Sequence, residues 1–353
     1  MFILLPLLIA FLGTVIITPF VIVWAKKYGL VDNPQTHKHP AMLHKKLIPR
    51  AGGVAIFIGI VFASLFLLPI TKTTIALFVA SFLALIVGTL DDKYDISPYI
   101  RLLMNIVCAV IAVSGGIGLP FITNPLGGII HLDMWKISFD FFGQHSILIL
   151  SDALAVIWIV WVMNMVNWSK GVDGQMPGVV AISAFVIGLL SLRFPLSDQS
   201  TAIAAQLAFM ITGSALGFLV FNFHPAKIFP GYGATAIYLL LSVVSILSGA
   251  KLATAILVLG VPLVDGTVTI LRRVLSGHSP FWHDKRHLHH LLLELGLGQR
   301  SIALTYWLFS ALLGTIALSL ESKGKAFAII MVIVLAGGTI LFLHRITKKK
   351  DET

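Results

Sequence analysis

Long apolar runs separated by short polar stretches dominate this chain. A helix that crosses the hydrocarbon core of a bilayer needs about 20 mainly apolar residues. The first run has no basic residue before it and is too long for a signal-peptide core, so we expect it to remain as a helix. The pattern predicts an all-α polytopic membrane protein. An error in the number of spanning helices is expected first in the short pair over 233–271. The predicted spanning helices, about eleven in number, cover residues 1–25, 52–70, 73–90, 101–120, 146–167, 177–194, 201–222, 233–250, 252–271, 302–320 and 326–344.

The polar stretches between these runs are too short to fold as separate soluble domains. We therefore expect a single integral membrane domain over residues 1–353. One long loop, 121–145, alternates apolar and polar residues from Ile129 to Phe142, which predicts a surface hairpin.

The basic residues divide unevenly between the two sets of alternate loops. Cytoplasmic loops are enriched in Lys and Arg, so the set that holds most of them is assigned inward. This places the N-terminus outside and the C-terminus in the cytoplasm. The outward loops hold only Lys72, Lys136, Arg193, Lys251, Lys323 and Lys325.

The composition supports a membrane protein and shows that the chain carries a net positive charge. Of the 353 residues, 58% are hydrophobic and 11% are charged, against about 25% charged in a soluble domain, which excludes a soluble enzyme. The formal net charge is +10, which suits anionic lipid or an anionic substrate. Cys108 is the only cysteine, which excludes an intramolecular disulfide and a cysteine metal cluster.

The few acids are informative because most of them fall on the inward side. Asp91 and Asp92 end a predicted helix, with Arg101 and Asn105 close behind. Two adjacent carboxylates repel each other unless a cation lies beside them, and hard oxygen ligands suit Mg²⁺ or Mn²⁺. The alternative is a water-exposed helix end.

A second cluster follows the predicted helix 146–167. Asn164 and Asn167 are three residues apart and so share a helix face, and amides within an apolar helix are costly without partners. Lys170 and Asp173 follow, with glycines that allow a close approach of backbone to a ligand. The alternative is a purely structural network between helices.

A third cluster comprises Asp284, His287, His289 and His290. His287 and His290 could meet on one helical face, with His289 pointing elsewhere. Because basic side chains crowd this loop, anion binding is favoured over a Zn²⁺ or iron site and over a plain surface loop.

A fourth stretch is the basic loop before the second helix, which contains His44, Lys46 and Arg50 and ends in a proline and a glycine pair. Such a helix entrance suits a phosphate-binding turn. The enrichment of cytoplasmic loops in basic residues explains it equally well.

The four stretches, taken in order from Asp32 to His290, resemble the polyprenyl-phosphate N-acetylhexosamine-1-phosphate transferases, a glycosyltransferase family 4 type. The resemblance implies eleven helices with the N-terminus outside, in a bacterial plasma (inner) membrane. It implies transfer of N-acetylglucosamine-1-phosphate from a UDP-N-acetylhexosamine to polyprenyl (undecaprenyl) phosphate, with release of UMP, as the first membrane step of cell-wall or surface polysaccharide synthesis. The partners expected are these two substrates and the lipid bilayer, and no nucleic acid; a homodimer is one candidate assembly.

The resemblance also implies roles for residues on cytoplasmic loops at about 26–51, 91–100, 168–176, 223–232 and 272–301. Asp91 is expected nearest the lipid phosphate, and Asp92 and Asp173 are expected to hold Mg²⁺ or Mn²⁺. Lys170 is added to the expected catalytic residues although it departs from the family pattern. The residues expected to bind substrate are His44, Lys46, Asn164, Asn167, Asn222, Asp284, Arg286, His287, His289 and His290.

Two positions depart from the family pattern. Lys170 and Tyr232 stand where relatives carry aspartates, so two carboxylates are lost and an ammonium is gained. We hypothesise that Lys170 takes over part of the charge neutralisation by the metal. The alternative for these two positions is a degenerate site with altered sugar or metal use. The alternatives to a transferase are a lipid-linked sugar binder or transporter and a di-iron oxidase.

Overall fold

Helices make up most of the structure, a computed structural model that describes residues 3–32, 47–125, 127–140, 144–247, 252–282, 284 and 286–351. Within these residues, six helices are long and apolar enough to cross a membrane, or seven if one bent pair is counted as a single span, which confirms the prediction of a helical membrane protein. They are α1 (Leu4–Lys27), α3 (Lys72–Tyr94), α5 (Ile149–Trp168), α7 (Gln199–Asn222), α12 (Gln299–Ser319) and α13 (Ser322–Asp351). The shorter apolar helices are α2 (Gly52–Leu67), α4 (Pro98–Ser114), α6 (Gln175–Ser191) and the continuous pair η1 (Tyr232–Ala234) and α8 (Thr235–Leu247).

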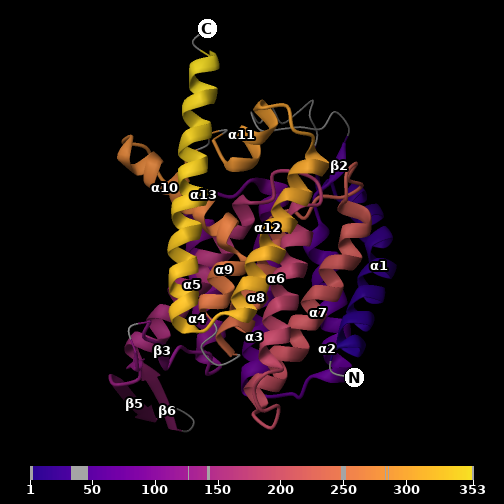
Figure 1. The fold of residues 1–353 in the computed structure, drawn as a ribbon. Coiled ribbons are helices and arrows are strands. Elements are labelled where there is room, and N and C mark those ends of the chain that lie inside the picture. Colours follow the sequence, from indigo (N-terminus) through magenta and orange to yellow (C-terminus); the bar gives the residue numbers. More distant parts are fainter. Residues whose placement is uncertain are drawn as a thin grey trace.

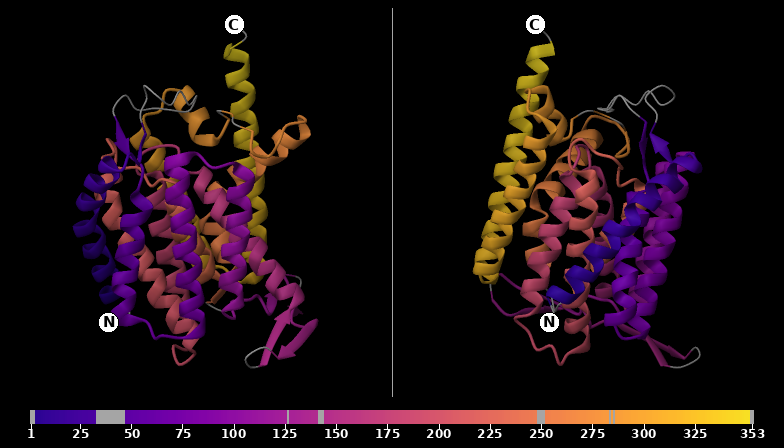
Figure 2. Two further views of the ribbon diagram at one scale, coloured as in Figure 1. Left: turned by 180° about the vertical axis from the view of Figure 1, so that it is seen from behind. Right: turned by 90° about the vertical axis from the view of Figure 1, so that its right-hand side faces the viewer.

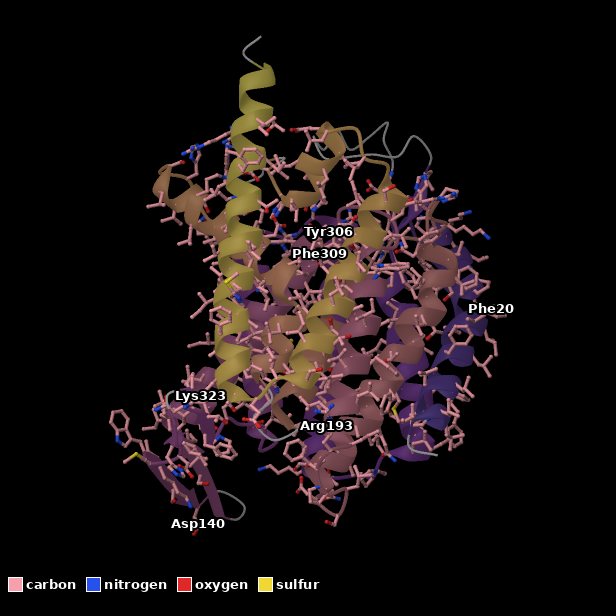
Figure 3. The ribbon with its side chains drawn as sticks, in the orientation of Figure 1. Phe20, Asp140, Arg193, Tyr306, Phe309 and Lys323 are labelled. Atoms are coloured by element: carbon pink, nitrogen blue, oxygen red, sulfur yellow. The ribbon has the colours of Figure 1, made fainter. Side chains whose placement is uncertain are left out.

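The outer surface of the bundle is apolar over much of its height. Phe20 on α1 and Phe309 on α12 are 67% and 48% exposed and project away from the helices (Figure 3). Charged residues such as Arg193 and Lys323 lie toward one end of the same view. Large exposed apolar surfaces of this kind are tolerated where lipid covers them.

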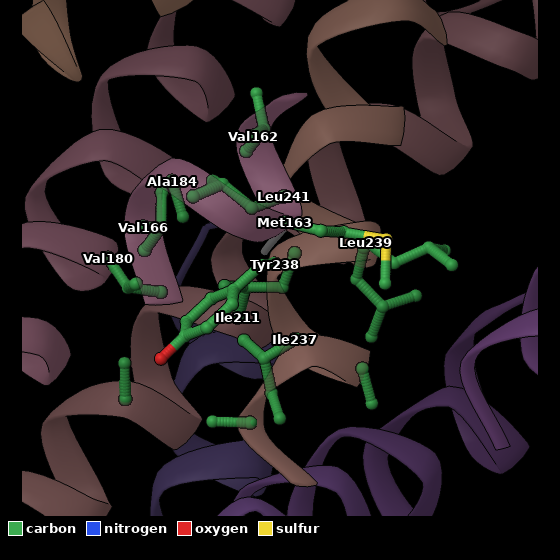
Figure 4. Packing of buried hydrophobic residues seen from close by; sticks show 14 of the residues in the cluster. Val162, Met163, Val166, Val180, Ala184, Ile211, Ile237, Tyr238, Leu239 and Leu241 are labelled. Carbon is green, nitrogen blue, oxygen red and sulfur yellow. The ribbon is translucent and has the colours of Figure 1, made fainter. Parts of the chain in front are cut away.

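Helix α8 forms the centre of the bundle. Every residue from Thr235 to Ile246 is buried, and Tyr238 packs among side chains of α5, α6 and α7, including Val166, Val180 and Ile211 (Figure 4). A helix that is apolar on all sides is stable only when other helices surround it. This explains why a short helix occupies the interior.

The predicted helix 252–271 is broken. Helices α9 (Leu252–Val258) and α10 (Gly260–Leu275) are bent by 80° where they meet. Pro262 has no N–H to donate to the carbonyl four residues earlier, and its ring clashes with that carbonyl, so a straight helix cannot continue. The single long helix expected here is therefore wrong in shape.

Short strands connect some of the helices. The predicted surface hairpin is confirmed as two antiparallel pairs, β3 (Phe121–Thr123) with β4 (Ile129–His131) and β5 (Lys136–Asp140) with β6 (Gln144–Leu148). Because β6 pairs as far as Leu148, α5 begins later than the predicted residue 146. A further pair joins β1 (Val31–Asp32) to β2 (Ile48–Pro49).

The two ends of the bundle differ in character. Strand β2 and the short helix α11 (Leu288–Glu294) lie at the end where the C-terminus emerges, and the β5–β6 hairpin lies with the N-terminus at the other (Figure 1). The rotated views in Figure 2 show the same separation. The ends of α3 and α5 that carry the predicted acids and amides therefore meet the histidine segment.

Candidate active site

A polar cavity of about 300 Å³ lies among the ends of these helices. It brings together residues from all four of the predicted clusters. The lining residues are Arg50, Asp91, Pro98, Arg101, Asn164, Asn167, Trp168, Lys170, Gly171, Tyr232, Arg273, Phe281, Trp282, Asp284, His287, His289 and His290.

Asp91, which is buried, forms an ion pair in this cavity with the half-buried Arg101. Arg101 donates from one nitrogen to both carboxylate oxygens of Asp91 at 3.2 Å, and the N–H of Ile96 donates to one of them at 3.0 Å. Asp95, with φ of 49°, ends α3 in the left-handed conformation, and Pro98 opens α4. This tight reversal is what returns Arg101 to Asp91.

Asp92 holds a turn and does not line the cavity. Both of its oxygens accept from the N–H of Tyr232 at 2.8 Å, one accepts from Gly233 at 3.3 Å, and Arg50 lies at 3.4 Å. Gly231 has φ of 70°, and a Cβ there would lie 2.2 Å from Asp92. Only glycine combines this backbone conformation with so close an approach.

Lys170 extends from the loop after α5 to the same turn. Its ammonium donates to the carbonyl of Gly231 at 2.6 Å and lies 5.7 Å from the centroid of the Tyr232 ring. Burial lowers the pKa of Lys170 to about 7, against the opposing attraction of Asp92. A bound phosphate would add negative charge and favour the ammonium form.

The ring of Tyr232 contacts two cations. Its centroid lies 5.1 Å from the guanidinium carbon of Arg101 and 5.7 Å from the ammonium of Lys170, and its hydroxyl accepts from Asn105 at 3.2 Å. Cation–π attraction is stronger at desolvated positions such as this. The tyrosine therefore holds Arg101 and Lys170 within reach of one ligand.

The two predicted amides line the cavity in different ways. Asn164 donates to the carbonyl of Val160 at 2.8 Å, which leaves its oxygen available. The side-chain oxygen of Asn167 is buried and has no hydrogen-bond partner in the described part of the chain. A buried acceptor without a donor is costly, so Asn167 is suited to receive a donor from a ligand.

Asp173 and Asn222 lie outside the cavity. The carboxylate of Asp173 contacts Nδ1 of His224 at 2.7 Å and accepts from the N–H of Ala226 at 3.0 Å. Asn222 accepts from the N–H of Gly174 and donates to the carbonyl of Ile228. Asp173 and Asn222 therefore hold loops, and within the described residues the partners of Asp173 are different from those of Asp92.

The histidines meet in the cavity by a different geometry from the one predicted. His287 precedes α11, and its Nδ1 lies 3.0 Å from Asp265. The rings of His289 and His290 are 4.2 Å apart. The expectation that His289 points elsewhere is wrong, because the helix begins only at Leu288. Burial and the neighbouring histidines lower the pKa of His289 well below its ordinary value.

Gly171 allows the histidine to pack against the lysine loop. A Cβ at Gly171 would lie 1.9 Å from Nε2 of His289. Any side chain at this position must therefore displace the imidazole or the loop.

Asp284 joins the end of α10 to the histidine segment. Arg273 donates to one carboxylate oxygen at 2.8 Å and Arg272 to the other. Burial alone would raise the pKa of Asp284, but the hydrogen bond and charge of Arg273, with Arg272, hold it below its ordinary value. Arg286 does not line the cavity, and its guanidinium lies 3.3 Å from His344 on α13. His44 and Lys46 lie outside the described residues.

The sequence also places the chain among known proteins. The profile of glycosyl transferase family 4 matches residues 74–249. A probable undecaprenyl-phosphate N-acetylglucosaminyl 1-phosphate transferase of Bacillus subtilis is 31% identical over 349 residues, 97% of this chain and 90% of the relative. The chain belongs to glycosyl transferase family 4.

Other members of glycosyl transferase family 4 match over most of their length. A decaprenyl-phosphate N-acetylglucosaminephosphotransferase of Mycolicibacterium smegmatis is 31% identical, over 84% of this chain and 78% of the relative. An undecaprenyl-phosphate alpha-N-acetylglucosaminyl 1-phosphate transferase of Escherichia coli K12 is 29% identical over the same shares. The predicted resemblance is confirmed.

The carboxylates at this site are not arranged to bind a divalent cation. Asp91 is bound by Arg101, Asp92 by backbone N–H groups and Arg50, and Asp173 lies elsewhere. Within the described residues, no three His, Cys, Asp or Glu side chains form a set that could hold a metal ion. Oxygen ligands that are free to turn toward the cation are what Mg²⁺ requires.

Sequence reasoning left several lining residues of this family 4 chain out of the predicted site. No site role was predicted for Arg50, Arg101 or Arg273, and Tyr232 stood out only as a departure from the family. Their adjacency to predicted acids was a usable signal for Arg101. The aromatic residues of the cavity gave no signal that distinguishes them from core residues.

Proposed function

We propose that this protein transfers N-acetylglucosamine-1-phosphate from a UDP-sugar to polyprenyl phosphate and releases UMP. The observation that carries the proposal is that α5 and α10 border both a cation-rich polar cavity and an apolar groove. This pairing suits a substrate with an anionic head and a long hydrocarbon chain. The chemistry in the names of the family 4 relatives agrees with it.

The apolar groove is suited to the polyprenyl chain. It has a volume of about 530 Å³ and is lined by side chains of α5, α9, α10 and α13, among them Trp161, Val268 and Leu271. Trp161 lies three residues before Asn164, and Leu271 two residues before Arg273, so α5 and α10 each carry lining residues of both the groove and the polar cavity. A chain in this groove would place its phosphate beside Asn164 and Arg273.

The cations of the cavity are suited to the pyrophosphate. Arg101, Lys170 and Arg273 line it from three different elements. Phosphoryl transfer depends mainly on positioning and on stabilising the charge that spreads over the oxygens. The guanidinium groups would hold the two reacting phosphates together against their mutual repulsion.

In the proposed reaction an oxygen of the lipid phosphate attacks the sugar-bearing phosphorus of the UDP-sugar. A new P–O bond forms, the bond to the bridging oxygen breaks, and UMP leaves with that oxygen and its electrons. The second pKa of a phosphate monoester is about 6, so the lipid phosphate is largely ionised at neutral pH and needs little general base. Asp91 lines the polar cavity and would orient Arg101.

The remaining predicted residues divide into binding and positioning roles. Asn164, Asn167, Asp284 and the histidines line the cavity and would contact the nucleotide-sugar. Asp92, Asp173 and Asn222 would act through the backbone turns that they hold. The expected Mg²⁺ or Mn²⁺ stays a prediction from the family, and the proposed reaction has no step that passes through it.

We also propose that the shorter apolar helices and the bent α9–α10 pair cross the membrane, which gives the predicted count of about eleven spans. The core runs continuously from α1 to α12, which favours a single domain. The basic loops at the cavity end favour the cytoplasmic face of a bacterial plasma membrane and an outside N-terminus. A C-terminal fluorescent-protein fusion should fluoresce, and an alkaline phosphatase fusion at the same position should be inactive.

Labelled UDP-N-acetylglucosamine tests the proposed activity. Membranes that contain the protein should transfer label to polyprenyl phosphate and release UMP, and Asp91→Asn should lower the rate at least about 100-fold. A panel of UDP-N-acetylhexosamines would identify the sugar. If no labelled lipid forms with any divalent metal or with EDTA, the proposed activity is wrong and a binding or transport role is favoured.

A further inference from the structure

We propose that Lys170 replaces the divalent cation in this site, so that the transfer runs without a bound metal. The inference rests on the proposed function and concerns how the negative charge of the reacting phosphates is neutralised. Its basis is the juxtaposition of the Lys170 ammonium, the carbonyl of Gly231 and the carboxylate of Asp92 around one turn.

The groups around the Lys170 ammonium are ones that stabilise a positive charge. The carbonyl of Gly231 accepts from Lys170 at 2.6 Å, and the face of the Tyr232 ring lies 5.7 Å from the same nitrogen. Asp92, which accepts from the N–H of Tyr232 in the same turn, is the carboxylate that attracts this ammonium most strongly. A carbonyl, a π-face and a carboxylate are together a site for a single positive charge, and the lysine already supplies that charge.

The carboxylates that could hold a metal are committed to protein donors. Asp91 accepts from Arg101 and from the N–H of Ile96. Asp92 accepts from the N–H groups of Tyr232 and Gly233. A divalent cation would have to break these bonds and also approach the Lys170 ammonium, which repels it.

Tyr232 offers no carboxylate to a metal. Its hydroxyl accepts from Asn105 at 3.2 Å, and its ring contacts both Arg101 and Lys170. A neutral phenol is a poor ligand for Mg²⁺, whereas its ring stabilises the two cations. The turn is therefore built to keep a lysine and an arginine beside the reacting phosphates.

Manganese titration tests the metal site independently of activity. Electron paramagnetic resonance of free Mn²⁺ should show that Lys170→Asp combined with Tyr232→Asp binds about one more Mn²⁺ per chain than the wild type. Lys93→Asp, which changes an exposed lysine outside the cavity, is the matched control and should bind no more Mn²⁺ per chain than the wild type. Size-exclusion chromatography in detergent identifies folded variants.

Activity provides the second arm. The wild-type rate should stay within about twofold when EDTA replaces Mg²⁺, and Lys170→Met should lower it at least about tenfold in both conditions. Lys170→Arg should retain more activity than Lys170→Met because it keeps the charge, and Lys93→Met should retain the full rate. These single variants carry the test if the double variant does not fold.

The outcomes separate the two proposals. A wild-type rate that falls more than about tenfold in EDTA and returns with Mg²⁺ would overturn the replacement of the metal by Lys170. So would Mn²⁺ binding by the wild type equal to that of the double variant. Absence of labelled lipid in every condition contradicts the proposed function instead, and the Mn²⁺ titration still decides whether the site takes a metal.

Discussion

Asn105 donates a hydrogen bond of 3.2 Å to the hydroxyl of Tyr232, whose ring contacts both Arg101 and Lys170. The hydroxyl and the ring therefore have separable roles. The hydroxyl satisfies a buried amide, and the ring stabilises two cations.

Substitution of Tyr232 by phenylalanine and by leucine should separate these roles. Tyr232→Phe leaves the amide of Asn105 without an acceptor, which should cost about 1–2 kcal/mol of stability and change the transfer rate little. Tyr232→Leu also removes the ring and should lower the rate further. The checks are thermal unfolding in detergent and labelled-lipid formation; equal rates for the two variants would contradict a role for the ring.

The ion pair of Asp91 and Arg101 should contribute to stability as well as to the site. Arg101→Met leaves a carboxylate that is 3% exposed without its partner, and breaking a buried pair costs about 3–5 kcal/mol. The double change to Arg101→Met and Asp91→Asn should recover part of the loss. A double-mutant cycle from unfolding midpoints measures the coupling, and additive losses would show that the pair does not act as a unit.

Lys170 should make stability depend on pH. The pKa of its side chain is lowered to about 7 in the folded protein from an ordinary value of 10.5. Between these values the unfolded chain binds more protons than the folded chain, so stability rises with pH through this window. The rise from pH 7 to 9 should be ~2 kcal/mol larger for the wild type than for Lys170→Met.

Unfolding midpoints at a series of pH values check this expectation. Lys93→Met serves as the control, because its side chain is exposed and should leave the pH dependence unchanged. Parallel curves for the wild type and Lys170→Met would show that the ammonium of Lys170 is not held in a desolvated position.

Filling the apolar groove should weaken binding of the lipid substrate alone. Val268→Trp places a large ring where the groove is lined by α10, and we expect KM for polyprenyl phosphate to rise about tenfold, equivalent to about 1.4 kcal/mol. KM for the UDP-sugar should not change. Leu275→Trp, at an exposed position of the same helix outside the groove, is the control, and equal effects of both variants would argue against the groove as the lipid site.

The sequence predicted most helices because their apolar runs have the length of a membrane span. It did not predict the bend before α10, because the run 252–271 stays apolar through Pro262 and the length rule takes no account of the lost hydrogen bond. It placed Asp91 near Arg101 because only nine residues separate them. It misplaced Asp173, because its partner His224 comes about 50 residues later and no local pattern reports that contact.

The bend between α9 and α10 also determines how a lipid could reach the site. In the groove beside the bend, Ile157, Leu271 and Ile333 are 60%, 55% and 54% exposed, so its wall is open to the surrounding bilayer. A polyprenyl chain can enter sideways from the membrane without passing through water. Since the tail exchanges one hydrocarbon environment for another, it gains little hydrophobic free energy on binding. Retention of the substrate must then depend mainly on its phosphate, and a product that carries an additional sugar and phosphate can diffuse away in the plane of the membrane.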